Sequence, residues 1–195
     1  MKRCKWCEND DLYMAYHDND WGQPVLDDRT MFEFLLLETF QAGLSWITIL
    51  RKRENFRRAF DDFNYEIVAG YDENKVQDLL ADAGIIRNQL KIRAAINNAR
   101  LVPEIQKEFG SLCDYFWQWV DYVPVVKEPK SVADYCANDA LSDAISKDMK
   151  KRGFKFVGTT VVYAHLQACG LVYEHEANCF LAGKAPKKVE ITEAF

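Results

Sequence analysis

The sequence predicts an all-α fold. Apolar residues recur at helical spacing, as at Val76, Leu79 and Ala83, whereas the alternation typical of strands is nearly absent. The chain has 195 residues, of which 49% are apolar and 28% charged, a balance typical of one globular domain. We expect residues 1–183 to form this domain, with two helical lobes around a cleft as one possible arrangement, and residues 184–195 to form a loosely ordered tail.

The first strong helical segment spans residues 31–39. It is apolar nearly all round, which predicts a buried helix. Asp28 or Thr30 is the expected N-cap, and Gly43 ends the pattern. A second helix is expected over residues 44–60, where apolar positions give way to basic ones towards the end.

The middle of the chain predicts two more helices and a connector. Residues 72–83 have amphipathic spacing that Gly84 ends, and residues 88–101 predict another helix. Residues 114–120 form a short aromatic-rich segment. Residues 123–130 contain two prolines and form the best connector in the chain.

The last strong pattern is a helix-hairpin-helix element. Residues 139–151 predict a helix, and Gly153 and Gly158 permit a tight turn that can approach a ligand closely. Thr159 or Thr160 is the expected cap of the next helix. The free N–H groups at such an N-terminus favour a phosphate, and contacts of this kind grip nucleic acid without reading its sequence.

Basic residues support this interpretation, although the formal net charge is −5. Lys155 lies in the turn, and further basic residues cluster at 51–58, 87–100 and 147–152. Folding could gather them on one face, and residues 82–96 could support DNA in the same way. Solvated helix faces and ordinary packing are the alternatives.

Glu38 is the only ionisable residue between Glu33 and Arg51. A carboxylate in such an apolar run is unfavourable unless it has a partner or a task. Aromatic rings stack nucleobases, and a carboxylate can accept hydrogen bonds from a base or favour its positive charge. The rings that could complete such a pocket, unless they are ordinary core residues, are Trp6, Tyr13, Tyr16, Trp21 and Trp46.

Two cysteines and two histidines near the chain ends form a candidate metal site. Cys4, His17, His175 and Cys179 together supply the four ligands of a tetrahedral zinc site. Such a closed site would be structural and would tie the two ends together. Cys7 offers a competing Cys-x-x-Cys pair with Cys4, and unligated residues are the other alternative.

The N-terminus lacks the apolar core of a secretory signal. No apolar run approaches the roughly 20 residues needed to span a bilayer. We therefore expect a cytoplasmic protein without a membrane partner, in which thiols stay reduced. Cys113, Cys136 and Cys169 are then expected to be plain buried thiols.

Four ordered segments together resemble the 3-methyladenine DNA glycosylase I family of bacterial alkylation-repair enzymes. They are Tyr16-His-Asp-Asn-Asp-Trp-Gly22, Gln41-Ala-Gly-Leu-Ser-Trp-Ile-Thr48, Asp82-Ala-Gly-Ile-Ile-Arg87 and Lys151-Arg-Gly-Phe-Lys-Phe-Val-Gly-Thr-Thr160. The likeness extends from Cys4 to about Cys179. It implies a helix-hairpin-helix superfamily fold whose N- and C-terminal segments are joined by a structural zinc.

The resemblance also implies an activity. A member of this family hydrolyses the N-glycosidic bond of 3-methyladenine in alkylated double-stranded DNA by base flipping, and releases free 3-methyladenine without strand cleavage. We expect a monomer. Many superfamily relatives carry a catalytic Asp in the helix after the hairpin, but residues 161–170 contain no acid, as is usual in this family.

The resemblance further implies roles for individual residues. Glu38, Tyr16 and Trp46 match positions that recognise the extruded base, and Leu44 is the position expected to wedge into the duplex. The remaining matches are Trp6, Tyr13 and Trp21 in or beside the pocket; Gly153, Lys155, Gly158 and Thr159 in the phosphate-gripping hairpin; and Cys4, His17, His175 and Cys179 as zinc ligands, with Cys7 as a bystander.

Two other functions compete with this one. A non-enzymatic, zinc-stabilised DNA-binding module would use the hairpin and the metal ligands but leave Glu38 and its rings as core. A zinc hydrolase such as a deaminase needs an open metal position and commonly a His-x-Glu motif. Here Glu176 directly follows His175, and four ligands leave no open position.

Overall fold

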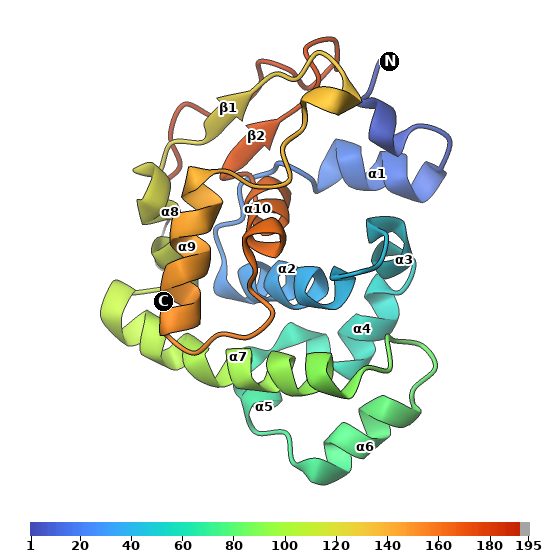
Figure 1. Ribbon diagram of the computed structural model, residues 1–195, viewed down its shortest axis with the longest axis vertical. Helices are drawn as coiled ribbons and strands as arrows, with labels where there is room; N and C mark the ends of the chain where they lie inside the picture. The colour runs from blue at the N-terminus through green and yellow to red at the C-terminus, as the bar shows by residue number, and fades with distance from the viewer. Residues whose placement is uncertain (192–195) are drawn as a thin grey trace.

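The computed structural model describes residues 1–191 and is mostly helical (Figure 1). This confirms the predicted predominance of helices. The α-helices of the described range are α1 (Asp11–Asn19), α2 (Asp28–Gln41), α3 (Trp46–Leu50), α4 (Arg53–Ala59), α5 (Tyr65–Ala69), α6 (Glu73–Ala81), α7 (Gln89–Phe109), α8 (Leu112–Trp117), α9 (Ala140–Lys151) and α10 (Thr159–Ala168). The 3-10 helices are η1 (Lys5–Cys7), η2 (Asp61–Phe63), η3 (Gln118–Val120) and η4 (Val132–Asp134).

A short parallel strand pair is the exception to the helical pattern. Strand β1 (Val125–Lys127) lies within the segment expected to be a plain connector, and it pairs with β2 (Val172–Glu174). Each strand has three residues, and all three residues of β2 are buried. The pair was not predictable because strands this short, with one fully buried, show no alternation.

Helix α2 lies at the centre of the fold and contacts α3, α7, α8 and α10 (Figure 1). Its residues from Met31 to Phe40 are all buried, which confirms the predicted buried helix. The predicted cap is wrong by one residue. Asp27 is the N-cap, with its carboxylate accepting the N–H of Thr30 at 2.8 Å, whereas Asp28 accepts N–H groups from the start of α8.

The helix predicted over residues 44–60 is two helices, α3 and α4. The break falls at Lys52, whose Nζ donates to the carbonyl oxygens of Ala83 and Gly84 at 3.1 and 3.0 Å. These two hydrogen bonds join the break between α3 and α4 to the bend that follows α6. A contact between segments so far apart in the chain is not visible in the local sequence pattern. Helix α7 also runs further than predicted, through Pro103 to Phe109.

The N-terminal segment lies against residues 176–180. The N–H of Phe180 donates to the carbonyl oxygen of Lys2 at 2.9 Å, and the N–H of Lys5 donates to Glu176 Oε1 at 2.8 Å. The expected tail is described as far as residue 191, and within it buried Val189 donates its N–H to Tyr122. No helix within residues 1–191 is long and apolar enough to cross a membrane.

Candidate active site and metal centre

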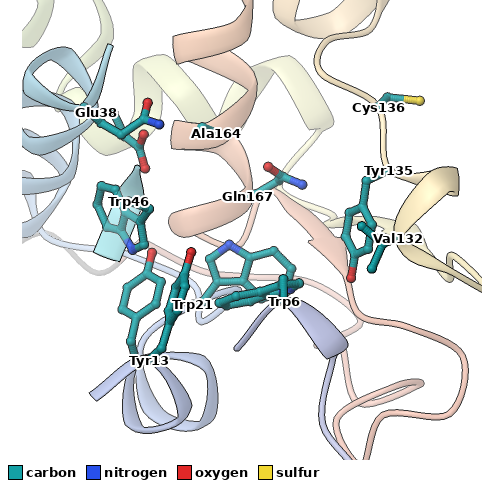
Figure 2. A pocket seen from close by; sticks show the side chains of 12 residues that line it. Trp6, Tyr13, Trp21, Glu38, Trp46, Val132, Tyr135, Cys136, Ala164 and Gln167 are labelled. Carbon is teal, nitrogen blue, oxygen red and sulfur yellow. The ribbon is translucent and has the colours of Figure 1, made fainter. Parts of the chain in front are cut away.

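A pocket of about 290 Å³ brings together the six residues predicted to form a base site (Figure 2). Its volume lies near the lower limit of small-molecule sites, about 300 Å³, which suits a single flat ring system. Its walls come from η1, α1, α2, α3, α10 and the segment around η4. The lining residues are Trp6, Tyr13, Tyr16, Trp21, Glu38, Gln41, Trp46, Val132, Tyr135, Cys136, Ala164 and Gln167.

Half of these residues were not predicted from the sequence. Ala164 and Gln167 lie on α10, and Val132, Tyr135 and Cys136 lie in or directly after η4. They reach the pocket only through tertiary contacts, so no local pattern marks them. Gln41 could have been predicted, because it is the first residue of segment 41–48, one of the four that carry the family resemblance.

Glu38 extends from α2 into the pocket and is 3% exposed. Among the described residues, none forms an ion pair or a side-chain hydrogen bond with it. Burial raises the pKa of Glu38 to about 8, because the charged form loses its hydration. In the free protein this side chain is therefore mainly protonated at pH 7.

The rings surround Glu38 at different angles. Tyr16 and Trp46 have ring centroids 5.4 Å apart and tilted by 45°, whereas Trp6 meets both Tyr13 and Trp21 edge to face at 4.9 Å. Burial raises the pKa of Tyr13 to about 12, and the Glu38 charge contributes in the same direction. The Tyr13 hydroxyl group is therefore protonated at neutral pH and can donate a hydrogen bond.

Two more polar atoms of the pocket residues are buried without a partner in the described part of the chain. They are Trp46 Nε1 and the Tyr135 hydroxyl. Buried polar groups are usually paired, because an unpaired one is costly. Both atoms are shielded from solvent, and the Tyr135 hydroxyl lies towards Cys4. Glu38, surrounded by flat aromatic faces, is therefore a polar group that the pocket leaves free to bind a ligand.

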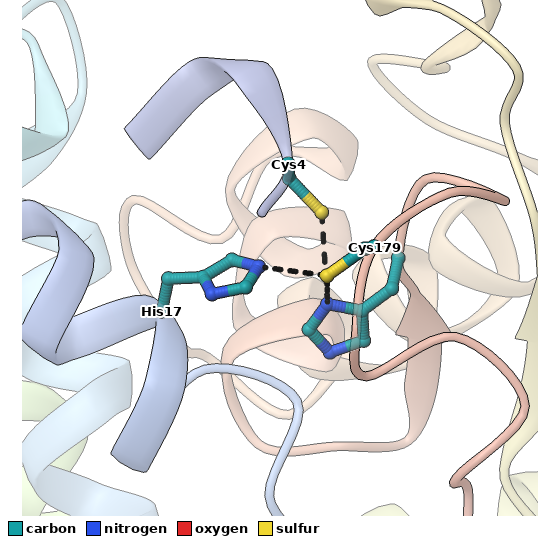
Figure 3. Close-up of side chains that lie close together, drawn as sticks. Cys4, His17 and Cys179 are labelled. Atoms are coloured by element: carbon teal, nitrogen blue, oxygen red, sulfur yellow. Dashed lines mark hydrogen bonds between the residues drawn. The ribbon is translucent and has the colours of Figure 1, made fainter. Parts of the chain in front are cut away.

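The four predicted metal ligands come together beside the pocket (Figure 3). Their ligand atoms all lie within 4.8 Å of one another, and all four residues are buried. Cys179 Sγ lies 3.5 Å from His17 Nε2 and 3.8 Å from His175 Nδ1, which is 3.6 Å from Cys4 Sγ. Zinc bonds of usual length separate tetrahedral sulfur and nitrogen ligands by about 3.6 Å. The donor set and its spacing therefore fit a metal ion.

A contact beside the cluster fixes the ring of His17, whereas His175 Nε2 is buried without a hydrogen-bond partner among the described residues. His17 Nδ1 lies 2.8 Å from Asp18 Oδ1, and Arg3 holds the same carboxylate at 2.7 Å. This leaves His17 Nε2 facing the cluster, in the arrangement usual for metal-binding histidines. Burial lowers the pKa of His17 and brings that of His175 to about 4, which keeps both rings in the neutral form that metals bind. Cys7 lies outside the cluster and donates its thiol to the Cys4 carbonyl.

The turn between α9 and α10 is rigidly held by α7. The Asn98 side chain accepts the N–H of Lys155 at 2.8 Å and donates to its carbonyl oxygen at 3.0 Å. Asn97 donates to the carbonyl oxygen of Gly153, whose φ of +96° favours glycine. The backbone of Lys155 is therefore fixed, while its side chain is exposed.

The predicted cap of α10 is wrong. Gly158 is the N-cap, and α10 begins at Thr159 without a side-chain cap. Thr159 Oγ1 instead donates to Asp143 Oδ1 on α9 at 2.6 Å, which draws the hydroxyl away from the helix N-terminus. A Cβ at Gly158 would meet nothing within 4 Å, so this approach to α10 is open.

Leu44 lies on the turn after α2, with 37% of its surface exposed. The turn is closed by two hydrogen bonds with Gln41: the Leu44 N–H donates to the Gln41 carbonyl at 2.7 Å, and Gln41 Nε2 donates to the Leu44 carbonyl at 2.8 Å. Gly43 has a φ of +80°. An exposed leucine is thus held directly next to a residue that lines the pocket.

Several basic residues serve internal contacts instead of one exposed face. Arg53 and Arg57 bind Glu33 at 2.6 and 3.0 Å. The lysines around the hairpin, in contrast, are exposed: Lys147, Lys150, Lys151 and Lys155.

The cysteine predictions are confirmed for Cys113 and Cys169, which are buried. The prediction is wrong for Cys136, which is exposed and lines the pocket. The local sequence pattern does not indicate this exposure.

The model of the methyladenine glycosylase family matches residues 6–182. The chain belongs to this family. A family relative, DNA-3-methyladenine glycosylase 1 of Escherichia coli (strain K12), is 47% identical over 179 residues, which cover 92% of this chain and 96% of that protein.

Solved structures in the methyladenine glycosylase family have the same fold. A crystal structure of 3-methyladenine DNA glycosylase I is 46% identical with a TM-score of 0.90, covering 93% of this chain and 100% of that one. A tyrosine-to-phenylalanine variant of 3-methyladenine DNA glycosylase I, in complex with 3-methyladenine, is 34% identical with a TM-score of 0.89 and covers 97% and 100%.

Proposed function

We propose that this protein is a DNA repair glycosylase that hydrolyses the N-glycosidic bond of 3-methyladenine in alkylated DNA. Family membership supports the activity. The observation that carries the assignment is Glu38, a buried and unpaired carboxyl group in an aromatic pocket. A non-enzymatic DNA-binding module has no use for such a group, and burying it is unfavourable.

Glu38 acts on the charge of the base. 3-Methyladenine attached to deoxyribose is cationic, so its departure neutralises the ring and needs little protonation. A cation in the pocket lowers the pKa of Glu38 again, so the carboxyl group releases its proton and faces the base as an anion. Tyr16 and Trp46 stack on the base or orient it, and water attacks the sugar through a transition state with oxocarbenium character.

The base reaches this pocket by flipping out of the duplex. The hairpin of Gly153, Lys155, Gly158 and Thr159 grips phosphates through the uncapped N-terminus of α10 and nearby lysines. Leu44 fills the gap that the base leaves. Its exposure and its position next to Gln41 support this role.

The chemistry proceeds without the catalytic Asp of other superfamily members. Helix α10 contains no acid. Glu174 accepts hydrogen bonds from Tyr163 and Gln167, and Glu176 accepts the N–H of Lys5. No lysine lines the pocket within the described residues, so we expect base release without strand cleavage. Monomeric action, a cytoplasmic location and the division into one domain with two lobes remain predictions.

Cys4, His17, His175 and Cys179 would hold a structural zinc ion. The matching sulfur–nitrogen distances support this proposal, and the ion would add stability by joining the chain ends. Cys179→Ser should lower zinc content and the thermal midpoint together, whereas Cys7→Ser should retain the metal. A native protein that is stable and contains no zinc by elemental analysis would contradict the proposal.

One assay tests the activity. The protein is incubated with double-stranded DNA treated with a methylating agent, and the released bases are identified by chromatography. We expect free 3-methyladenine and intact strands. DNA that is bound without release of any base would instead support a non-enzymatic binding module.

A further inference from the structure

Gln167 lines the pocket from α10, and the proposed mechanism does not use it. Its Nε2 donates to Glu174 Oε2 at 2.6 Å. Among the described residues, no donor forms a hydrogen bond with its Oε1. In Figure 2 the amide oxygen of Gln167 lies on the side of the pocket towards Glu38 and Trp46. This oxygen is therefore a free acceptor on the pocket wall.

A chain of hydrogen bonds fixes the direction of this amide. Lys127 Nζ lies 2.8 Å from the Tyr163 hydroxyl oxygen, and an ammonium group can only donate. The single Tyr163 proton is then donated to Glu174 Oε2, at 2.9 Å. Glu174 is the acceptor in this chain, so Gln167 must present its N–H₂ group to the same oxygen.

The opposite orientation is strongly disfavoured. Glu174 is 2% exposed, so little water can screen it. A flipped amide would put the Gln167 carbonyl oxygen against the carboxylate, with the loss of a charge-assisted hydrogen bond. Lys127 is itself anchored by Asp139 Oδ2 at 2.8 Å, so the chain cannot easily reverse.

We propose that Gln167 determines which purine the pocket accepts, and that Glu174 is the positioning residue that fixes its amide. Gln167 Oε1 accepts a hydrogen bond from an amino group at position 6, as in 3-methyladenine. The carbonyl at position 6 of 3-methylguanine would meet it acceptor to acceptor, and such unpaired polar contacts give strong discrimination. This inference rests on the proposed glycosylase function.

The test compares two bases released from the same alkylated DNA. Gln167→Met keeps the length of the side chain but removes the acceptor. We expect its single-turnover rate for 3-methyladenine, relative to that for 3-methylguanine, to fall about tenfold from the wild-type ratio. Gln106→Met is the matched control, because Gln106 is also half-buried and donates to a carboxylate, Asp28 Oδ2 at 2.8 Å, but lies outside the pocket. Its ratio should stay at the wild-type value.

Glu174→Gln tests the positioning role separately. An amide at this position can donate as well as accept, so Gln167 is free to flip, and the ratio should fall by an intermediate amount. A wild-type protein that releases both bases equally well, or variants of Gln167 and Glu174 with unchanged ratios, would overturn the inference. A wild-type protein that releases neither base would overturn the proposed function instead.

Discussion

Helix α2 carries two buried glutamates with opposite surroundings. Glu33 is 4% exposed and binds Arg53 and Arg57 at 2.6 and 3.0 Å. Glu38 is 3% exposed and has no charged partner among the described residues. One helix thus contains a carboxylate whose charge is balanced inside the protein and a carboxyl group whose charge would be balanced only by a ligand.

The difference shows how burial alone does not identify a functional residue. Glu33 faces α4, which supplies two arginines, whereas Glu38 faces a pocket of aromatic rings. A buried acid with two cationic partners is explained by structure. A buried acid without one is a candidate for function, because its desolvation is otherwise uncompensated.

The largest expected effect is on stability between pH 4.5 and about 8. Burial raises the pKa of Glu38 from 4.5 to about 8, so between these values the folded chain binds more protons than the unfolded chain. This contribution to the free energy of unfolding is fully present below pH 4.5 and is lost as pH rises to about 8, by up to about 1.4 kcal/mol per pH unit.

Glu38→Gln should remove this loss. Urea unfolding at several pH values should show the variant gaining stability over wild type from pH 4.5 to 8. Glu104→Gln, at an exposed position on α7, is the control and should follow the wild-type profile. Parallel pH profiles for wild type and Glu38→Gln would mean that Glu38 ionises normally in the folded protein.

Glu33→Gln should lower the stability of the protein, whereas Glu38→Gln should raise it. It leaves Arg53 and Arg57 without their shared partner, although Asp20 and Asp62 still reach them at 3.1 Å. We expect the free energy of unfolding to fall by about 3 kcal/mol, the lower end for breaking a buried ion pair. Base release measured below the unfolding transition should be retained. A variant as stable as wild type would show that the ion pairs contribute little.

The next effect concerns catalysis. Glu38→Gln keeps the size of the side chain but cannot become an anion beside a cationic base. Single-turnover excision of 3-methyladenine should fall about 100-fold, equivalent to roughly 2.7 kcal/mol of transition-state stabilisation. An excision rate equal to that of wild type would refute the proposed role of Glu38, whatever the effect on stability.

The smallest effect is expected just beyond the end of α2. Leu44→Ala removes the exposed side chain proposed to fill the duplex gap, and excision from double-stranded DNA should fall about tenfold, since unstacking is then less well compensated. Binding of free 3-methyladenine, measured by calorimetry, should be unchanged. Ile67→Ala, another exposed aliphatic position on α5, should excise normally. A normal excision rate for Leu44→Ala would place the wedge elsewhere.

Local patterns in the sequence were sufficient for much of the fold. The buried stretch of α2, the amphipathic stretches of α6 and α9 and the glycine-bounded hairpin were all predicted from periodicity and turn residues. Errors arose where distant contacts decided the outcome. Asp28 accepts N–H groups from α8 instead of capping α2. The predicted helix over residues 44–60 is interrupted at Lys52, which binds the bend after α6. Strand β1 pairs with β2 in a segment that was predicted to be a plain connector.

The candidate site divides in the same way. The isolation of Glu38 and the spacing of the cysteines and histidines are properties of the sequence, because residue type and spacing restrict which groups can bind a metal or a base. Pairing is a property of the tertiary structure, because hydrogen bonds and ion pairs depend on distances of a few ångströms between segments far apart in the chain. The sequence by itself therefore determined that α2 carries two acids in an apolar setting. Only the fold decided that Glu33 is neutralised by arginines and that Glu38 is left open to a ligand, opposite an amide of Gln167 fixed by Glu174.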